Sequence, residues 1–148
     1  MRITNPAHIS EPGYLELYMG TGAHGHNTND CLESPPETLL DELERRGAEV
    51  RVYSSWKTFQ CFLRMEVSAG EAGEDSSDQE TMARVFGDIR EGVHPDVLCV
   101  HLGDTDTRAH HGEYGGYLAA LQYCDCALGR LWGELQGIPK YRDKTVMV

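Results

Sequence analysis

The segment HPDVLCVHLGDTDTRAHHGEY, residues 94–114, decides the fold class because an apolar run leads directly into a polar one. The apolar part, DVLCV at residues 96–100, is continuous rather than alternating, which predicts a strand buried on both faces, as in a parallel sheet. From His101 to Tyr114 the chain then carries three acidic residues and three histidines. Ligands of open α/β sheets collect beyond the carboxyl ends of strands, so this polar part is a candidate site.

Helical and extended patterns alternate along the rest of the chain. We expect helices over residues 35–47, 79–92 and 114–136, with a short one within 55–65, and strands over 50–53, within 94–104 and over 144–148. Residues 68–80 are predicted to form an acidic surface loop. The core face of the last helix is predicted to contain Leu118, Leu121, Leu128, Leu131, Trp132 and Leu135. The alternation predicts an α/β fold, a mainly parallel sheet flanked by helices, in one domain spanning residues 1–148.

Composition excludes several classes of partner. The 148 residues carry a net charge of −11 with a pI of about 4.9, which argues against nucleic acid or an anionic membrane surface as the ligand. No apolar run approaches the ~18–20 residues of a membrane span. The first ten residues lack the apolar core of a signal peptide.

The five cysteines are odd in number and form no CxxC pair; they are Cys31, Cys61, Cys99, Cys124 and Cys126. We expect them to be buried, reduced thiols. Unpaired cysteines favour a reducing compartment such as the cytoplasm.

Asp106 and His110 are four residues apart, so one helical turn would place both side chains on the same face. A carboxylate with an imidazole suits zinc or another divalent ion. An aspartate that caps a helix, beside solvated histidines, is an equally simple interpretation of the spacing. Asp104 is expected to cap or support, although it could compete with Asp106 for a metal.

Ser10 lies at the start of a predicted helix, with Pro12 in its first turn. It is predicted either to cap that helix or, because a hydroxyl there faces free N–H groups and the positive end of the helix dipole, to act as a nucleophile. The polar segment HGHNTND, His24–Asp30, forms either a turn or an oxyanion contact. Among the histidines we expect His24, His26 and His111 to be solvated or to face substrate, and His101 to be buried with a partner.

Two blocks in this order resemble the alkaline phosphatase superfamily. NPAHISEPGYLELYMG, residues 5–20, is similar to its nucleophile block, S/T-x-P followed by a helix and a glycine ten residues on. The segment from LGDTDTRAHHGEY to KTVMV, residues 102–148, looks like its block of strand, metal-binding loop, long helix and strand. TNDCLESPPETLLDEL, residues 28–43, resembles the segment that follows the nucleophile in a bacterial metalloenzyme-like branch.

The resemblance implies a metal-dependent phosphoryl-transfer hydrolase, of phosphatase or phosphodiesterase type, that acts on a small phosphate ester. Asp106 and His110 would bind the first of two divalent metal ions, with zinc expected before manganese or magnesium. Ser10 would be the nucleophile and would bridge towards the second ion. Asn29 would hydrogen-bond the phosphoryl oxygen. Tyr14 stands where sulfatases have an arginine, so the resemblance does not extend to sulfatases.

Other parts of the superfamily pattern have no counterpart in these residues. Nine residues precede Ser10, too few for the strand that carries an early metal-binding Asp, and the Asp–His pair expected after the strand at residues 144–148 is also missing. We therefore expect an internal fragment with an incomplete alkaline-phosphatase-like core, inactive by itself. The alternatives are a phosphomutase of the same superfamily and a non-catalytic truncated remnant.

Overall fold

The computed structural model describes residues 9–22, 25–70 and 75–148, which form six helices and three strands. The helices are α1 (Ser10–Met19), α2 (Leu39–Arg45), α3 (Phe59–Phe62), α4 (Asp78–Arg90), α5 (Asp104–His110) and α6 (Tyr114–Gly137). The strands are β1 (Val50–Ser54), β2 (Val67–Ser68) and β3 (Val97–His101).

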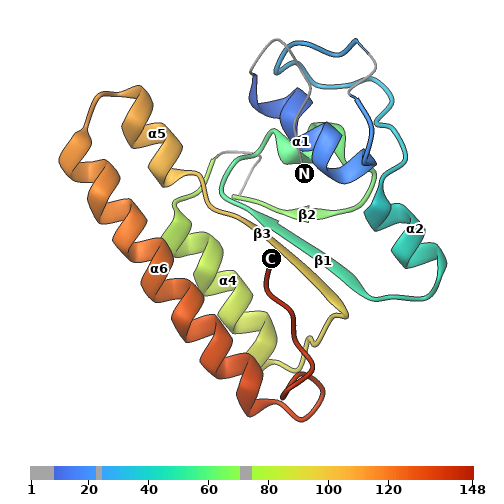
Figure 1. Ribbon diagram of the computed structural model, residues 1–148, viewed down its shortest axis with the longest axis vertical. Helices are drawn as coiled ribbons and strands as arrows, with labels where there is room; N and C mark the ends of the chain where they lie inside the picture. The colour runs from blue at the N-terminus through green and yellow to red at the C-terminus, as the bar shows by residue number, and fades with distance from the viewer. Residues whose placement is uncertain (1–8, 23–24, 71–74) are drawn as a thin grey trace.

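The strands form one parallel sheet in the order β2-β1-β3. Val52 pairs with Val67 on one side of β1, and five residues of β1 pair with β3 on the other, from Val50 with Val97 to Ser54 with His101. The predicted α/β fold with a parallel sheet is therefore confirmed, and the carboxyl ends of β1 and β3 lie side by side (Figure 1).

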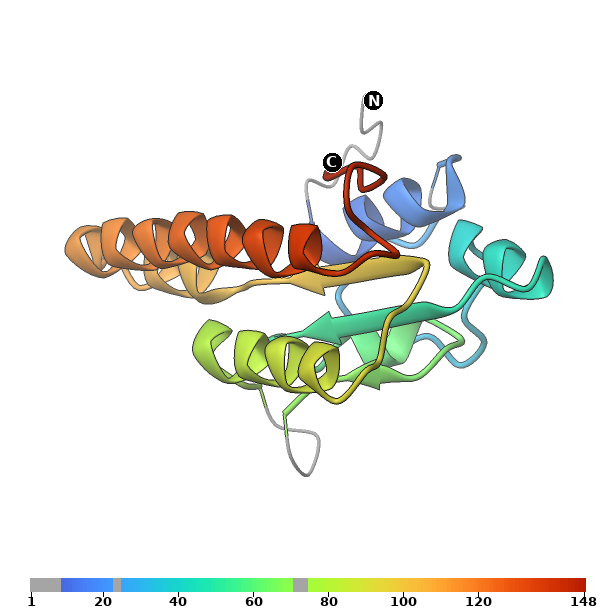
Figure 2. The ribbon, with the colours of Figure 1, turned by 90° about the horizontal axis from the view of Figure 1, so that it is seen from below.

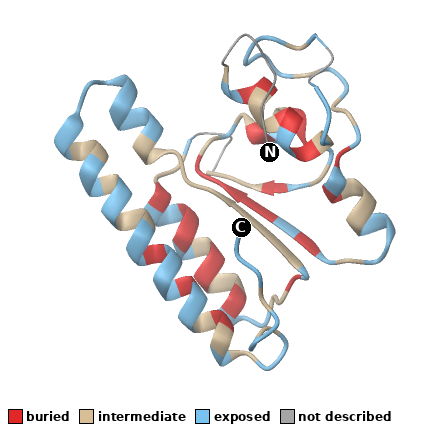
Figure 3. Ribbon diagram, in the orientation of Figure 1, coloured by how far each residue is buried: buried red, intermediate tan, exposed pale blue. Residues whose placement is uncertain are grey.

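Helices cover both faces of the sheet (Figures 1 and 2). Val50 and Val52 of β1 pack into one cluster with α1, α2 and α3, whereas Tyr53 packs into a second cluster with α4 and α6. The side chains of β3 alternate in the same way. This period of two divides the core into two parts, and burial is concentrated on the surfaces that face the sheet (Figure 3).

Two helix starts are fixed by capping boxes. Thr38 accepts the N–H of Asp41 while the Asp41 carboxylate accepts the N–H of Thr38, and Ser77 and Glu80 do the same for α4. The prediction that the first of these helices begins at Pro35 is wrong by four residues, because the capping box fixes the start at Leu39. The chain leaves α2 through Gly47, whose φ is 89°.

The predicted core face of α6 is largely wrong. Leu131 and Leu135 are buried together with Ala127, whereas four predicted core residues are more than two-fifths exposed, namely Leu118, Leu121, Leu128 and Trp132. Residues 127, 131 and 135 form a narrow stripe four residues apart. The buried contact of the helix with the cluster around α4 follows this stripe, which is narrower than the apolar surface that the sequence presents.

Three further predictions about the sheet need correction. Residues 145–148 form no strand, because they do not join the ladder, and Val146 and Val148 are exposed. Val67–Ser68 is a short strand at a position where only a loop is predicted. β3 is half-buried along its whole length, because among the described residues it pairs with β1 only.

The cysteines also differ from expectation. Cys31 and Cys61 form a disulfide across 30 positions, and Cys126 is exposed. Both bonded residues lie outside regular strands, so no periodicity in the sequence indicates the pairing. None of the helices in the described part of the chain is long and apolar enough to cross a membrane.

Candidate functional site

Ser10 is the first residue of α1, and its side chain is exposed. The N-cap position is Ile9, which makes no side-chain capping bond, so the prediction that Ser10 caps the helix is wrong. Pro12 lies in the first turn as predicted, where its missing N–H costs nothing. The Ser10 hydroxyl therefore stands at the helix start without a capping role.

Asn29 supplies the acceptor that a cap would otherwise provide. Its side-chain Oδ1 accepts the N–H of Glu11 at 2.9 Å, across 18 positions of sequence. This bond places Asn29 beside the residue that follows Ser10. Two residues later, the Cys31–Cys61 disulfide fastens the same loop to α3.

Glu11 is a feature of this region that the sequence did not reveal. Its side chain is 0% exposed, and its Oε1 lies 2.9 Å from Nε2 of His26. Burial raises the pKa of the Glu11 carboxyl, and the neighbouring His26 opposes that rise. An acidic residue in a first helical turn normally faces solvent and complements the helix dipole, so the sequence gives no sign of its burial. His26, which is expected to be solvated or to face substrate, has a side chain that is 16% exposed and paired with Glu11. His24 lies outside the described residues.

Asp106 and His110 lie on the same face of α5, as their spacing predicts. Oδ2 of Asp106 is 3.5 Å from Nε2 of His110, and the two side chains are 71% and 76% exposed. A carboxylate and an imidazole so placed fit a divalent ion by chemistry. No three His, Cys, Asp or Glu side chains within residues 9–22, 25–70 and 75–148 gather into a metal-binding group.

The carboxylate of Asp104 accepts a backbone hydrogen bond from the start of α4. Its Oδ2 accepts the N–H of Asp78 at the first turn of α4, at 3.2 Å, whereas the N-cap of its own helix α5 is Gly103. Asp78 in turn accepts the N–H groups of Gly103 at 2.7 Å and Asp104 at 3.2 Å. Burial is the main reason that the pKa of Asp78 is raised. The start of α5, the helix that carries Asp106, is therefore anchored through the backbone N–H groups of Gly103 and Asp104.

Tyr14 links the two parts of the candidate site. It lies one turn after Ser10 on α1, and burial and then the negative charge of Asp106 raise the pKa of its phenol. Its ring also lies edge-on to His101, with centroids 5.5 Å apart. The negative charge of Asp106 on α5 thus acts on a side chain of α1.

His101 has a partner, as predicted, but it is half-buried rather than buried. Tyr18 Oη is hydrogen-bonded to its Nε2 at 2.5 Å, and its ring stacks on Phe59. Burial lowers the pKa of His101 to about 4, so the imidazole is neutral at physiological pH. The His101 side chain thus packs at the carboxyl end of β3 against Phe59 and Tyr18.

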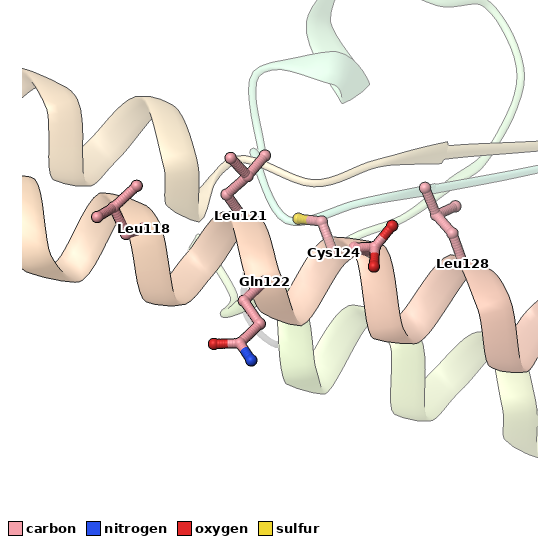
Figure 4. A pocket seen from close by; sticks show the side chains of 6 residues that line it. Leu118, Leu121, Gln122, Cys124 and Leu128 are labelled. Carbon is pink, nitrogen blue, oxygen red and sulfur yellow. The ribbon is translucent and has the colours of Figure 1, made fainter.

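A shallow pocket lies elsewhere, on the exposed side of α6 (Figure 4). It is lined by Leu118, Leu121, Gln122, Cys124, Asp125 and Leu128. The predicted site residues do not line it. Its wall is formed mainly by the exposed apolar face of α6 itself.

Comparisons with protein-family models, curated proteins and solved structures gave no match for this chain.

Proposed function

We propose that the chain carries part of the site of a metal-dependent phosphoryl-transfer hydrolase, built on an alkaline-phosphatase-like core, with a small phosphate ester as substrate. The observation that carries the proposal is the hydrogen bond between Asn29 Oδ1 and the N–H of Glu11. It brings together two residues, Ser10 and Asn29, to which the sequence resemblance gives roles at a single phosphoryl group. The charge of Asp106, which together with burial raises the pKa of Tyr14 on α1, supports the same grouping.

In this proposal Ser10 Oγ forms a bond to phosphorus as the ester P–O bond breaks, and the alcohol leaves with a proton. Water then hydrolyses the phosphoserine and releases phosphate. The Asn29 amide N–H₂ donates to a phosphoryl oxygen while its Oδ1 remains on the Glu11 N–H. Asp106 and His110 would hold a divalent ion. Such an ion supplies positive charge to the transferring and leaving oxygens.

The test uses the full-length protein that contains this chain, with Zn²⁺ or Mn²⁺ and an aryl phosphate, because the chain is expected to be inactive by itself. We expect hydrolysis, and mass spectrometry should detect phosphoserine at residue 10. Ser10→Ala should abolish both signals, and Ser34→Ala, a change at another exposed serine, should leave them intact. Asn29→Asp keeps the acceptor for Glu11 but removes the donor, and should lower kcat by about 10²–10³-fold.

Full activity of the Ser10→Ala variant would refute the assigned nucleophile. A chain that binds inorganic phosphate but never turns over the ester would favour the non-catalytic alternative. The non-catalytic alternative is favoured by one observation: among the described side chains, no third donor lies beside Asp106 and His110. A phosphomutase would instead return the phosphoryl group to an added phosphosugar.

A further inference from the structure

The Cys31–Cys61 disulfide joins a packed helix to a segment without regular structure. Cys61 lies on α3 between Phe59 and Phe62, which are 1% and 0% exposed. Cys31 lies within residues 25–38, which form no helix or strand. Segments of this kind open locally at a lower free energy than packed helices. The disulfide therefore fastens the loop covalently to the core cluster on which α3 packs.

The same loop carries two side chains that contact the start of α1. Asn29 Oδ1 accepts the N–H of Glu11 at 2.9 Å, and Nε2 of His26 lies 2.9 Å from Oε1 of Glu11. Asn29 precedes Cys31 by two residues, and two residues of chain span at most about 7 Å. While the disulfide is closed, Asn29 therefore cannot move far from the Glu11 N–H.

The disulfide is accessible to a reductant from the loop side. Cys31 is exposed and Cys61 is half-buried, and the other three cysteines are free thiols. A thiolate of a dithiol can attack Cys31 Sγ, which breaks the S–S bond and releases Cys61 as a thiolate. The second thiol of the reductant then releases Cys31. Two electrons and two protons pass to the cysteines, and the dithiol becomes a disulfide.

We infer that the Cys31–Cys61 disulfide is a redox switch for the loop that carries His26 and Asn29. The oxidised form holds both side chains at the start of α1, and reduction by a dithiol releases them. The consequence for catalysis rests on the proposed function, in which Asn29 must lie beside Ser10. Reduction would then lower the activity by removing a donor to the phosphoryl group.

Limited proteolysis with a glutamate-specific protease tests the release of the loop. The full-length protein that contains this chain is treated with and without a dithiol, and mass spectrometry follows cleavage after Glu33 and after Glu91. Glu33 lies in the loop and Glu91 follows α4, and both are exposed. Reduction should accelerate cleavage after Glu33 about 10-fold or more relative to cleavage after Glu91, because only the loop loses its covalent attachment.

Two cysteine variants separate the disulfide from other effects of the reductant. Cys31→Ser should be cleaved rapidly after Glu33 with or without the dithiol. Cys126→Ser is the matched control, because Cys126 is also exposed but unbonded, and it should respond as the wild type does. Unchanged cleavage after Glu33 on reduction, equal acceleration at Glu33 and Glu91, or loss of the folded circular dichroism spectrum of the reduced wild type would each overturn the local switch.

The catalytic consequence is measured separately on the full-length protein with Zn²⁺ and an aryl phosphate. Cys31→Ser replaces the reductant here, because thiolates also bind zinc. It should lower kcat about 10-fold or more, since Asn29 is no longer held as a donor. Rapid cleavage after Glu33 with unchanged kcat would overturn the role of the switch in catalysis. A wild type that never hydrolyses the ester would refute the proposed function, whereas the redox switch of the loop is decided by the cleavage after Glu33.

Discussion

At the carboxyl end of β3, the His101 ring lies 3.8 Å from the Phe59 ring between centroids and shares a hydrogen bond with Tyr18. Desolvation in this environment disfavours the imidazolium form and lowers the pKa of His101 to about 4. The packing at this end of the sheet therefore favours the neutral form of the His101 ring. Its protonation must be linked to the free energy of unfolding.

The unfolded chain, in which His101 has a pKa of about 6.5, binds more protons than the folded chain between pH 4 and pH 6.5. The contribution of His101 to stability is therefore complete above pH 6.5 and is lost as the pH falls to about 4. Across that window we expect a loss of about 3 kcal/mol from this residue. Urea denaturation at a series of pH values measures it.

His101→Gln removes the titrating group and is the control for this slope. The variant should show a shallower dependence of unfolding free energy on pH between 4 and 6.5. Equal slopes in the variant and the wild type would show that His101 is not the group responsible. Asp78, whose pKa burial raises, acts in the opposite direction because it gains protons on folding, so it cannot produce the expected loss.

At the scale of elements, α6 shows how little of an apolar helix a small sheet can cover. Leu131 is 4% exposed and Leu128 is 41% exposed, although the two residues are only three positions apart. The guanidinium of Arg130 lies over the Phe86 ring of α4, 4.0 Å from its centroid, at the border of the buried stripe. The helix is thus held along one line and is open on its other apolar side.

Leucine-to-alanine substitutions on the two sides of this border should have different effects. Leu131→Ala removes buried methyl groups from the cluster with α4, and should lower the free energy of unfolding by about 2–5 kcal/mol. Leu128→Ala is the matched control on the same helix, and should cost less than about 1 kcal/mol. Chemical denaturation measures both, and equal losses would contradict the packing described for α6.

At the scale of the whole molecule, two cores share one thin sheet. Phe59 and Phe62 belong to the core beside α1, whereas Met82 and Val85 belong to the core beside α4. The Cys31–Cys61 disulfide lies on the side of the first core, where it joins α3 to the long segment between α1 and α2. Its effect is on the chain as a whole, since it restricts the unfolded state.

Reduction of this disulfide should lower the free energy of unfolding by roughly 3–4 kcal/mol, given a bonded pair 30 positions apart. Thermal unfolding with and without a dithiol reductant measures the change. Cys126→Ser should respond to the reductant as the wild type does, whereas Cys31→Ser should already be destabilised and respond no further. An unchanged melting temperature of the wild type after complete reduction would contradict the prediction.

The sequence predicted α2, β1, α4, β3 and α6 in their order and the parallel sheet, because long amphipathic helices and a continuous apolar strand leave local patterns. It missed β2 and predicted a strand at residues 144–148 that does not form. It also predicted the shared face of Asp106 and His110, which depends on helical geometry alone. It did not predict the burial of Glu11, the acceptor role of Asn29 towards Glu11 or the Cys31–Cys61 disulfide. Each of these depends on contacts between distant segments. The uncovered side of α6 was missed for a related reason: apolar spacing shows which residues prefer burial but not how much surface the neighbouring elements cover.

The reciprocal bonds between Asp78 and Asp104 have a consequence for local unfolding. Each aspartate receives the N–H of the other, so the first turns of α4 and α5 lose a hydrogen bond whenever either one frays. The two helix starts should therefore open as one cooperative unit, and their amides should exchange with solvent at a common opening free energy. In this way the residues that begin α4, far from Asp106 in sequence, set the lifetime of the turn that presents it.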